Sequence, residues 1–242
     1  MGAVAPLYLF LHYILSSIEN FSSRDQRLTN TRVSFASLPA VLLTYLIPFY
    51  IAVYEPSAAA RQPLLYLWQL YPVWLSLSVW IIGKLFLRDT VAEDKLYRTE
   101  KDLPVMRWYV GASSALAAAV WVGTVWGAGM GGISGVFVPS TLPRSLPSLV
   151  GFMGQFLRWD EVFTFASHLV WLGYLFWDLA AAGMLREGWL TAAGCGVASL
   201  LAVGPGATVG MGWLWREHIL ATRRHKNALT PETVGRLHGL AV

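Results

Sequence analysis

The chain has 242 residues, of which 55% are hydrophobic and 13% are charged, and its formal net charge is +4. Soluble domains carry about 25% charged residues, so the composition excludes an ordinary soluble domain and indicates an integral membrane protein. No basic stretch alternates with aromatic residues, and we therefore expect no nucleic-acid binding. The single cysteine excludes a disulfide framework. We predict one all-α domain, 1–242, built as a polytopic bundle of seven transmembrane helices.

Six predicted spans are evident from long apolar runs. One further candidate span, 145–159, is the fifth in chain order; it is short and lies within a stretch rich in Pro and Gly. The distribution of Lys and Arg residues favours including 145–159 as a span. With seven spans, three of the 18 Lys and Arg residues lie on one side (Arg61, Arg144 and Arg186) and the other fifteen lie opposite. Positive residues collect on the cytosolic side, which predicts a lumenal N-terminus, a cytosolic C-terminus and residence in the endoplasmic reticulum membrane. Whether 145–159 crosses fully stays open, because about 15 residues is below the usual spanning length. The predicted spans are 3–18, 35–54, 64–87, 109–130, 145–159, 162–185 and 189–215, followed by a basic tail, 216–242.

The first two predicted spans carry a few polar residues. His12 lies midway along the first span and Glu19 lies at its cytosolic end. His12 has a plainer interpretation as a hydrogen-bonded packing residue. Tyr54 and Glu55 lie at the lumenal end of the second span, where Glu55 is equally well explained as a loop residue before Pro56.

The third predicted span has a polar stripe. Its members follow helical spacing and are suited to face the bundle interior. The stripe begins at Gln69 in the lumenal half, passes through Trp80 and ends at Lys84, whose ammonium group is expected to extend to the cytosolic edge.

The sixth predicted span, 162–185, carries the most informative residue, Asp178. A carboxyl group inside a membrane-spanning helix costs about 2.5–3.5 kcal/mol on insertion scales, so it is expected to face the bundle interior or a cavity. At 100° per residue, Asp178 shares a face of about 120° with His168, Trp171 and Tyr174. An acid, a histidine and two electron-rich rings on one stripe favour a reaction site. The alternative is a structural Asp that joins two helices by a hydrogen bond.

Motifs for metal chemistry are missing from the sequence. There is no Asp-rich DDxxD or DxDD run and no H-E-x-x-H pair, so metal-assisted diphosphate ionisation and the soluble protonating cyclase mechanism lack their residues. We therefore expect no metal and no cofactor. The chemistry is left to acids, bases and aromatic rings, whose faces stabilise cations by about 2 kcal/mol or more when desolvated.

Four segments carry a resemblance to a known family: HYILSSIENFSSRDQRL (12–28), LPAVLLTYLIPFYIAVYEP (38–56), LWQLYPVW (67–74) and WDLAAAG (177–183). With them the chain resembles the small multi-pass membrane terpene cyclases of fungal meroterpenoid pathways, of the ascofuranone, macrophorin and paxilline kinds. The resemblance covers most of the chain in size and span layout.

This resemblance implies cofactor-free, proton-initiated cyclisation of a prenylated substrate that bears a polyene or a terminal epoxide. In the paxilline-like branch an acid in an early helix works with an aspartate in a late one. Asp178 takes the late role, and Glu55 is the candidate for the early role, with Glu19 or His12 as substitutes. His168 or Tyr174 is the candidate acceptor of the final proton. The residues expected to line the substrate are Trp171, Tyr174, Gln69, Trp80, Tyr54 and Trp68.

Other classes stay open on the sequence alone. They are a seven-helix transporter or receptor-like protein, a structural membrane protein without catalysis, and an enzyme that isomerises double bonds of sterol-like molecules. Transporters usually show inverted repeats, and the prolines at 39, 48 and 72 do not recur in the second half. The expected partners are an apolar prenylated small molecule and membrane lipid, and the oligomeric state is left open.

Overall fold

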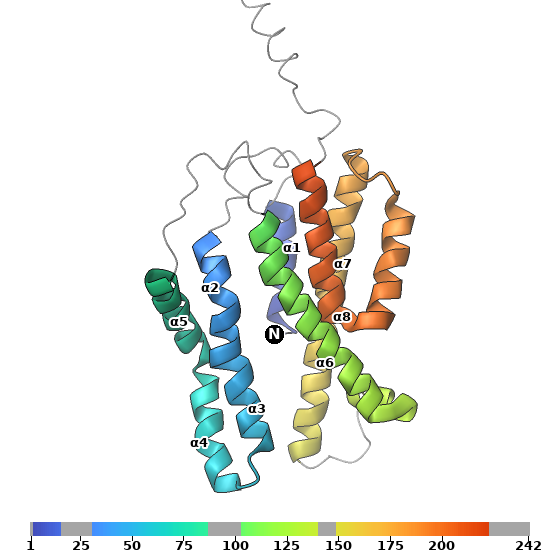
Figure 1. The fold of residues 1–242 in the computed structure, drawn as a ribbon. Helices are drawn as coiled ribbons and strands as arrows, with labels where there is room; N and C mark the ends of the chain where they lie inside the picture. The colour runs from blue at the N-terminus through green and yellow to red at the C-terminus, as the bar shows by residue number, and fades with distance from the viewer. Residues whose placement is uncertain (1, 16–30, 87–102, 140–148, 223–242) are drawn as a thin grey trace, which may run out of the picture. The chain divides into compact units, whose positions relative to one another are not determined.

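A computed structural model describes residues 2–15, 31–86, 103–139 and 149–222. Within these ranges the chain forms helices joined by turns and contains no strand, so the all-α prediction is confirmed for them. Four of the described helices are long and apolar enough to cross a membrane, or five if one bent pair counts as a single span. Figure 1 shows their arrangement within two compact units, which we describe separately: Arg24–Ser113, and Met1–Ser23 with Ser114–Val242.

The first unit contains a long helical rod that includes the predicted span 35–54. It consists of α2 (Thr31–Val41), a π-helical turn η3 (Leu42–Leu46) and α3 (Ile47–Tyr54). Pro48 explains the π turn, because a proline has no N–H to donate and its ring clashes with the carbonyl four residues earlier. The backbone widens just before it, so that the Ile47 N–H bonds to the Leu42 carbonyl five residues back.

A second rod in this unit is bent. The helices α4 (Ala58–Gln69) and α5 (Tyr71–Phe86) meet at an angle of 61°. Pro72 disfavours a helical backbone at the residue before it, which explains why the break falls at Leu70–Tyr71. α2 packs against α5, and α3 packs against α4. α4 begins at Ala58, six residues before the start of the predicted span 64–87.

In the second unit, α1 (Val4–Leu15) packs against α7 (Leu149–Ala181) in a parallel orientation. Two hydrogen bonds fix the direction. The Gly2 N–H donates to Asp160 Oδ1 at 2.6 Å, and the Tyr13 hydroxyl donates to Asp178 Oδ1 at 3.1 Å. Residue numbers rise along both helices between these contacts, so the two helices run the same way.

The predicted break between spans 145–159 and 162–185 is wrong, because α7 continues through it for 33 residues without interruption. The polar pair Asp160 and Glu161 suggested a loop. Instead, the Asp160 carboxylate accepts the hydrogen bond from Gly2, and its carbonyl accepts one from the Thr164 hydroxyl at 2.7 Å. Contact with α1 thus satisfies a polar position inside the helix.

The span predicted at 189–215 is a helical hairpin. Gly204 interrupts α8 (Trp189–Thr222) with a φ of 81° and a ψ of 170°, a conformation that is essentially restricted to glycine. The Thr208 hydroxyl lies 3.0 Å from the Ser199 hydroxyl, whereas nine residues of straight helix would separate them by about 13.5 Å. Figure 1 shows the two arms side by side, joined by a turn. We call Trp189–Val203 the first arm and 205–222 the second arm.

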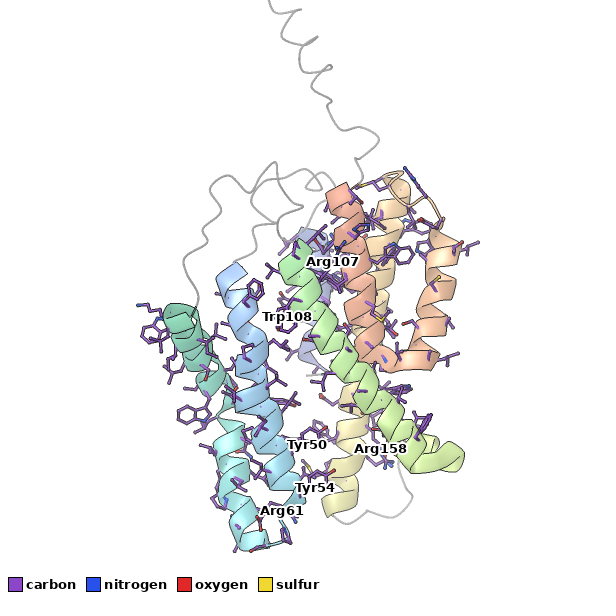
Figure 2. All side chains as sticks on the ribbon, in the orientation of Figure 1. Tyr50, Tyr54, Arg61, Arg107, Trp108 and Arg158 are labelled. Carbon is purple, nitrogen blue, oxygen red and sulfur yellow. The ribbon has the colours of Figure 1, made fainter. Side chains whose placement is uncertain are left out.

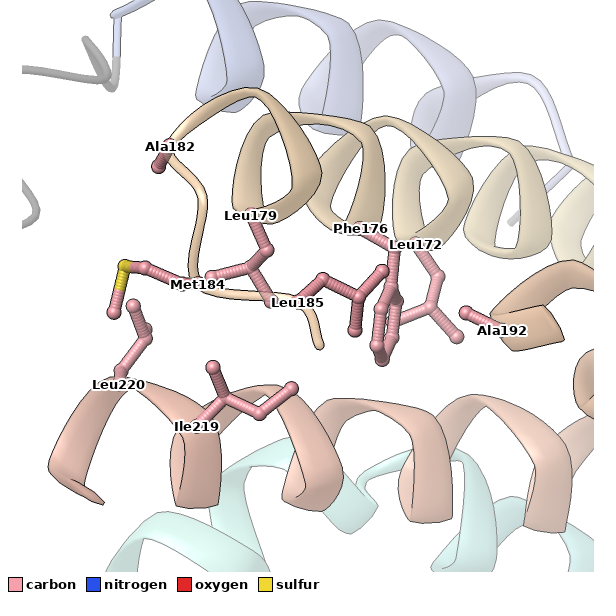
Figure 3. Close-up of a cluster of buried hydrophobic side chains, with 9 residues drawn as sticks. All are labelled: Leu172, Phe176, Leu179, Ala182, Met184, Leu185, Ala192, Ile219 and Leu220. Carbon is pink, nitrogen blue, oxygen red and sulfur yellow. The ribbon is translucent and has the colours of Figure 1, made fainter. Parts of the chain in front are cut away.

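The C-terminus of α7 falls four residues before the predicted end of its apolar stretch. Gly183 has a φ of 71° and donates to the Ala180 carbonyl at 3.0 Å, and Met184 donates to the Leu179 carbonyl at 2.9 Å. These two bonds form a Schellman motif. Leu179 and Met184 also join the buried apolar cluster between α7 and the second arm (Figure 3). Asp178 therefore lies in the last turn of α7 and not deep inside a longer helix.

Candidate functional site

The candidate site lies along the face of α7 that meets α1. Asp178 is 6% exposed, and its Oδ1 accepts the hydrogen bond from the Tyr13 hydroxyl. The Tyr13 ring also lies 5.2 Å from the Tyr174 ring, centroid to centroid. Because α1 runs parallel to α7, the same register places His12 against Trp171 with ring centroids 5.7 Å apart and edge to face. We call Asp178, Tyr13, Tyr174, His12 and Trp171 the α1/α7 site.

The α1/α7 site joins residues that the sequence placed on different helices. His12 of the first predicted span contacts Trp171 of the α7 stripe, so residues of both helices can act on one substrate. Tyr13 was missed by the sequence analysis. Its one available signal was its position next to His12 on a span with few polar groups.

Two groups on α7 retain hydrogen-bonding capacity, one in the site and one beside it. The Trp171 Nε1 is buried without an acceptor among the described residues. His168, one turn before Trp171, places Nδ1 2.7 Å from the Thr164 carbonyl oxygen. A carbonyl only accepts, so Nδ1 carries a hydrogen, and in the neutral ring Nε2 then keeps its lone pair. His168 is thereby set up as a base and Trp171 as a donor.

The second arm of α8 contributes a cation near Asp178. The Arg216 guanidinium acts electrostatically on the Asp178 carboxyl, and it forms an ion pair with the neighbouring Glu217. In the described ranges no direct ion pair joins Arg216 to Asp178. Asp178 also lies in the last turn of a helix, where the dipole disfavours a negative charge. A proton that leaves this carboxyl therefore leaves a negative charge, which Tyr13 and Arg216 stabilise among the described residues.

The remaining candidates lie in the first unit, at the α3–α4 junction and along α4 and α5. Glu55 Oε1 accepts a hydrogen bond from the Ser57 N–H at 3.0 Å, so its carboxylate closes the turn before α4. Arg61 donates to the Glu55 carbonyl at 2.6 and 3.1 Å, and Tyr54 is 79% exposed beside Tyr50 (Figure 2). This geometry favours the interpretation of Glu55 as a turn residue. Glu19 lies outside the described residues.

Trp68 lies in a group of aromatic rings at the π turn and the α4–α5 bend. Its ring centroid is 5.4 Å from that of Tyr45, 5.5 Å from that of Phe49 and 6.2 Å from that of Tyr71. The Trp68 Nε1 is buried without an acceptor among the described residues.

The other two candidates of the first unit are exposed. Trp80 is 57% exposed and lies under the Lys84 ammonium group, which is 4.7 Å from its ring centroid. The Trp80 ring therefore already binds a cation of its own chain. Gln69 is exposed at the end of α4. Neither residue contacts the other candidates of this unit through a ring or hydrogen bond in the described ranges.

A metal site is not formed by the described residues: no three His, Cys, Asp or Glu side chains gather there.

The chain is similar to proteins of two Penicillium species. It is 38% identical over 234 residues to the FAD-dependent monooxygenase verC1 of Penicillium polonicum, covering 97% of this chain and 29% of that protein. It is 36% identical over 225 residues to the FAD-dependent monooxygenase anuJ of Penicillium roqueforti, covering 93% of this chain and 27% of that protein. The chain thus spans less than a third of the length of these curated relatives. No solved structure matches it.

Because these relatives are named FAD-dependent, the described residues can be compared with what an FAD site needs. The stretch 127–132, Gly-Ala-Gly-Met-Gly-Gly, has the glycine spacing of a dinucleotide-binding loop. That loop works only between a strand and the N-terminus of a helix, where free N–H groups bind the pyrophosphate. Here the stretch lies within α6 (Leu103–Phe137), and no strand precedes it among the described residues. The stretch 127–132 therefore does not form such a loop.

One family covers nearly the whole chain. The CtvD domain matches residues 1–221, which include the first unit, most of the second unit and the whole α1/α7 site. The chain belongs to the CtvD-domain family.

Proposed function

We propose that the protein is a membrane-embedded cyclase that starts ring closure by donating a proton from Asp178. The observation that supports this most strongly is the hydrogen bond from the α1 residue Tyr13 to a carboxyl that is 6% exposed. It leaves Oδ2 of Asp178 without a protein partner among the described residues. A protonated Oδ2 can then face a substrate, while Tyr13 holds the carboxyl group in one orientation.

The proposed substrate is a prenylated molecule that bears a terminal epoxide. The curated relatives are named FAD-dependent monooxygenases and contain the matched domain as under a third of their length. A monooxygenase adds one oxygen atom to its substrate, and an olefin that gains one becomes an epoxide. An acid that opens the epoxide is a chemically suitable next step. This reasoning favours the epoxide over the polyene.

The proposed reaction conserves atoms. The proton on Asp178 Oδ2 moves to the epoxide oxygen, one carbon–oxygen bond breaks, and an internal double bond or hydroxyl attacks the electron-poor carbon. The carboxylate that remains is stabilised by the Tyr13 hydroxyl and the charge of Arg216. A proton is then lost to His168 Nε2 or Tyr174. His168 is about 15 Å along α7 from Asp178. At this distance it can take the final proton from a carbon remote from the opened epoxide.

Aromatic rings and one donor complete the proposed site. Tyr174 is 53% exposed, so its ring face is open to a cationic intermediate. The unpaired Trp171 N–H is available to bind an oxygen of the substrate. Leaving a buried donor unsatisfied costs about 1–3 kcal/mol, and a bound substrate oxygen would remove this cost.

We also propose seven membrane crossings, placed differently from the sequence prediction. They are the longer spans α2–α3, α4–α5, α6, α7 and the second arm of α8, together with two shorter apolar helices, α1 and the first arm of α8. With these crossings, Arg61, Arg144 and Arg158 fall on one side and the other fifteen of the 18 Lys and Arg residues fall opposite. The positive side is cytosolic, which again gives a lumenal N-terminus. A glycosylation acceptor fused to the N-terminus is expected to be modified, and one fused to the tail is not; the reverse result would contradict this topology.

The revised topology changes the choice of the second acid. Glu55 follows the second crossing on the lumenal side, whereas Asp178 lies three residues before the cytosolic end of α7. Glu19 follows α1 on the cytosolic side and becomes the better candidate for the early-helix acid. A Glu55→Gln variant is therefore expected to keep turnover, and a Glu19→Gln variant to lose part of it.

The proposed activity is tested with microsomes that contain the full chain. They are fed a farnesylated phenol with a terminal epoxide, or the same compound with its terminal double bond intact. A product of unchanged mass with a new retention time and ring signals in its NMR spectrum supports the proposal. A product heavier by one water would show epoxide hydrolysis and contradict ring closure. Microsomes without the chain are the control.

A further inference from the structure

We propose that the cavity between α7 and the two arms of α8 binds one acyl chain of a membrane lipid. The cavity has a volume of about 520 Å³, which lies within the usual range of small-molecule sites. Its walls come from three directions: Leu172, Gly173 and Phe176 of α7, Ala192 and Gly196 of the first arm, and Met211 of the second arm. No residue of the α1/α7 site lines it.

The cavity and the α1/α7 site use opposite faces of α7. At 100° per residue, Leu172, Phe176, Leu169 and Gly173 centre about 150° away from the face that carries Asp178. A single substrate therefore cannot occupy the cavity and touch Asp178 without passing around the helix. This separation makes the proposed lipid site independent of the proposed cyclase activity.

The chemistry of the lining selects a plain hydrocarbon. Its two hydroxyl groups, Ser199 and Thr208, bond to one another at 3.0 Å, and Thr208 also bonds to the Gly204 carbonyl at 2.8 Å. These polar groups are satisfied within the hairpin, so an occupant needs no polar atom to match them. A prenylated phenol with an epoxide would place its oxygens against carbon.

The exposed residues at the rim of the cavity indicate that its occupant enters from the bilayer. Val197 is 60% exposed and Met211 is 51% exposed, so the cavity opens at the surface of the hairpin. Beside the opening, the first arm presents Leu201 and Leu190, which are 75% and 80% exposed. In a membrane protein such an apolar surface faces lipid tails. An empty cavity of this size forfeits dispersion contacts along its walls, and the bilayer supplies hydrocarbon chains that restore them.

The test uses the full chain in nanodiscs that contain a phosphatidylcholine with a diazirine on one acyl chain. After illumination, the crosslinked residues are mapped by mass spectrometry. Crosslinks at Leu172 and Ala192, both 7% exposed, report a chain inside the cavity, whereas crosslinks at Leu201 report ordinary contact with the bilayer. We expect all three in the wild type. Crosslinks at Leu201 alone would overturn the proposal.

Two glycines provide a matched pair of variants. A Cβ at Gly173, which lines the cavity, and one at Gly154, which is on the same helix but does not, each meet nothing within 4 Å. Gly173→Phe is expected to lower crosslinking at Ala192 about tenfold, equivalent to roughly 1.4 kcal/mol of affinity. Gly154→Phe is expected to leave it unchanged. If Gly173→Phe does not accumulate, Gly196→Phe with Gly194→Phe as its control makes the same comparison on the first arm.

Competition separates a lipid from a substrate as the occupant. Added dioleoylphosphatidylcholine is expected to reduce crosslinking at Ala192, and dihexanoylphosphatidylcholine, whose chains are too short to fill the cavity, is not. If an epoxide-bearing farnesylated phenol reduces this crosslinking and dioleoylphosphatidylcholine does not, the cavity is a substrate site and the lipid proposal fails. Turnover by the α1/α7 site is measured separately and does not enter this result.

Discussion

The two faces of α7 differ in what they leave exposed. The face toward α8 carries Leu172, Phe176 and Leu179, each under 8% exposed, and joins the buried apolar cluster. The face toward α1 holds a buried carboxyl but leaves Tyr174 half-exposed, and the unpaired indole N–H of Trp171 lies one turn before Tyr174. Burial without unpaired polar groups gives stability, whereas open rings and an unpaired donor retain capacity to bind. One helix thus carries the stability of this unit on one side and the proposed chemistry on the other.

The largest effect on stability is expected on the α8 face. Leu179 is completely buried, so Leu179→Ala leaves a cavity and is expected to cost about 2–5 kcal/mol. Membrane-extracted variant protein should lose thermal stability and accumulate poorly. The control is Leu201→Ala, which truncates a side chain that is 75% exposed. Equal stability of the two variants would contradict the assignment of this face to folding.

Substitutions on the α1 face of α7 and its partner residues are expected to lower turnover rather than stability. Tyr13→Phe removes the hydrogen bond to Asp178, and a bond to a group that becomes charged is worth about 1.5–3 kcal/mol. Turnover should fall by about tenfold or more, while accumulation stays near that of the wild type. Tyr8→Phe is the control on the same helix, because the Tyr8 ring lies 6.1 Å from the His12 ring, centroid to centroid, and the side chain is 63% exposed. Similar losses in both variants would assign Tyr13 to packing.

A smaller effect is expected at Trp171. Trp171→Phe keeps an aromatic ring but removes the N–H, and a neutral hydrogen bond contributes about 0.5–1.5 kcal/mol. We expect KM to rise by about two- to tenfold with little change in kcat. Trp177→Phe, at a 58% exposed position against Trp189, should change neither. A change in the product profile without a change in KM would place the role of Trp171 in cation stabilisation.

The sequence predicted the composition of the α7 stripe well because helical periodicity alone determines which residues share a face. It predicted the span boundaries less well, and each error has a local cause. Asp160 looked like a loop residue because its partner, the Gly2 N–H, is remote in sequence. Gly204 looked like one more small residue in an apolar run, although it reverses the chain and a Cβ there would lie 2.5 Å from the Trp121 ring.

Tyr13 shows the same limit at the site. Nothing in a single sequence pairs the first helix with the seventh, so the hydrogen bond to Asp178 depends on tertiary packing. The parallel orientation of α1 and α7 follows from the continuity of α7, and it also moves Asp178 from the lumenal to the cytosolic end in the proposed topology. Local patterns therefore predicted which residues share a face of α7 but not their partners on α1.

In the proposed reaction Asp178 supplies the initiating proton. The most direct measurement compares turnover of the epoxide substrate by wild type, Asp178→Asn and Asp178→Glu in membranes with matched amounts of protein. Asn keeps the size and accepts the Tyr13 hydrogen bond but cannot donate the acid proton, so Asp178→Asn should lose about 10²–10⁴-fold in rate, and Asp178→Glu should retain part of the activity. Normal turnover by Asp178→Asn would contradict the claim, and failure of this variant alone to accumulate would assign Asp178 to the structure.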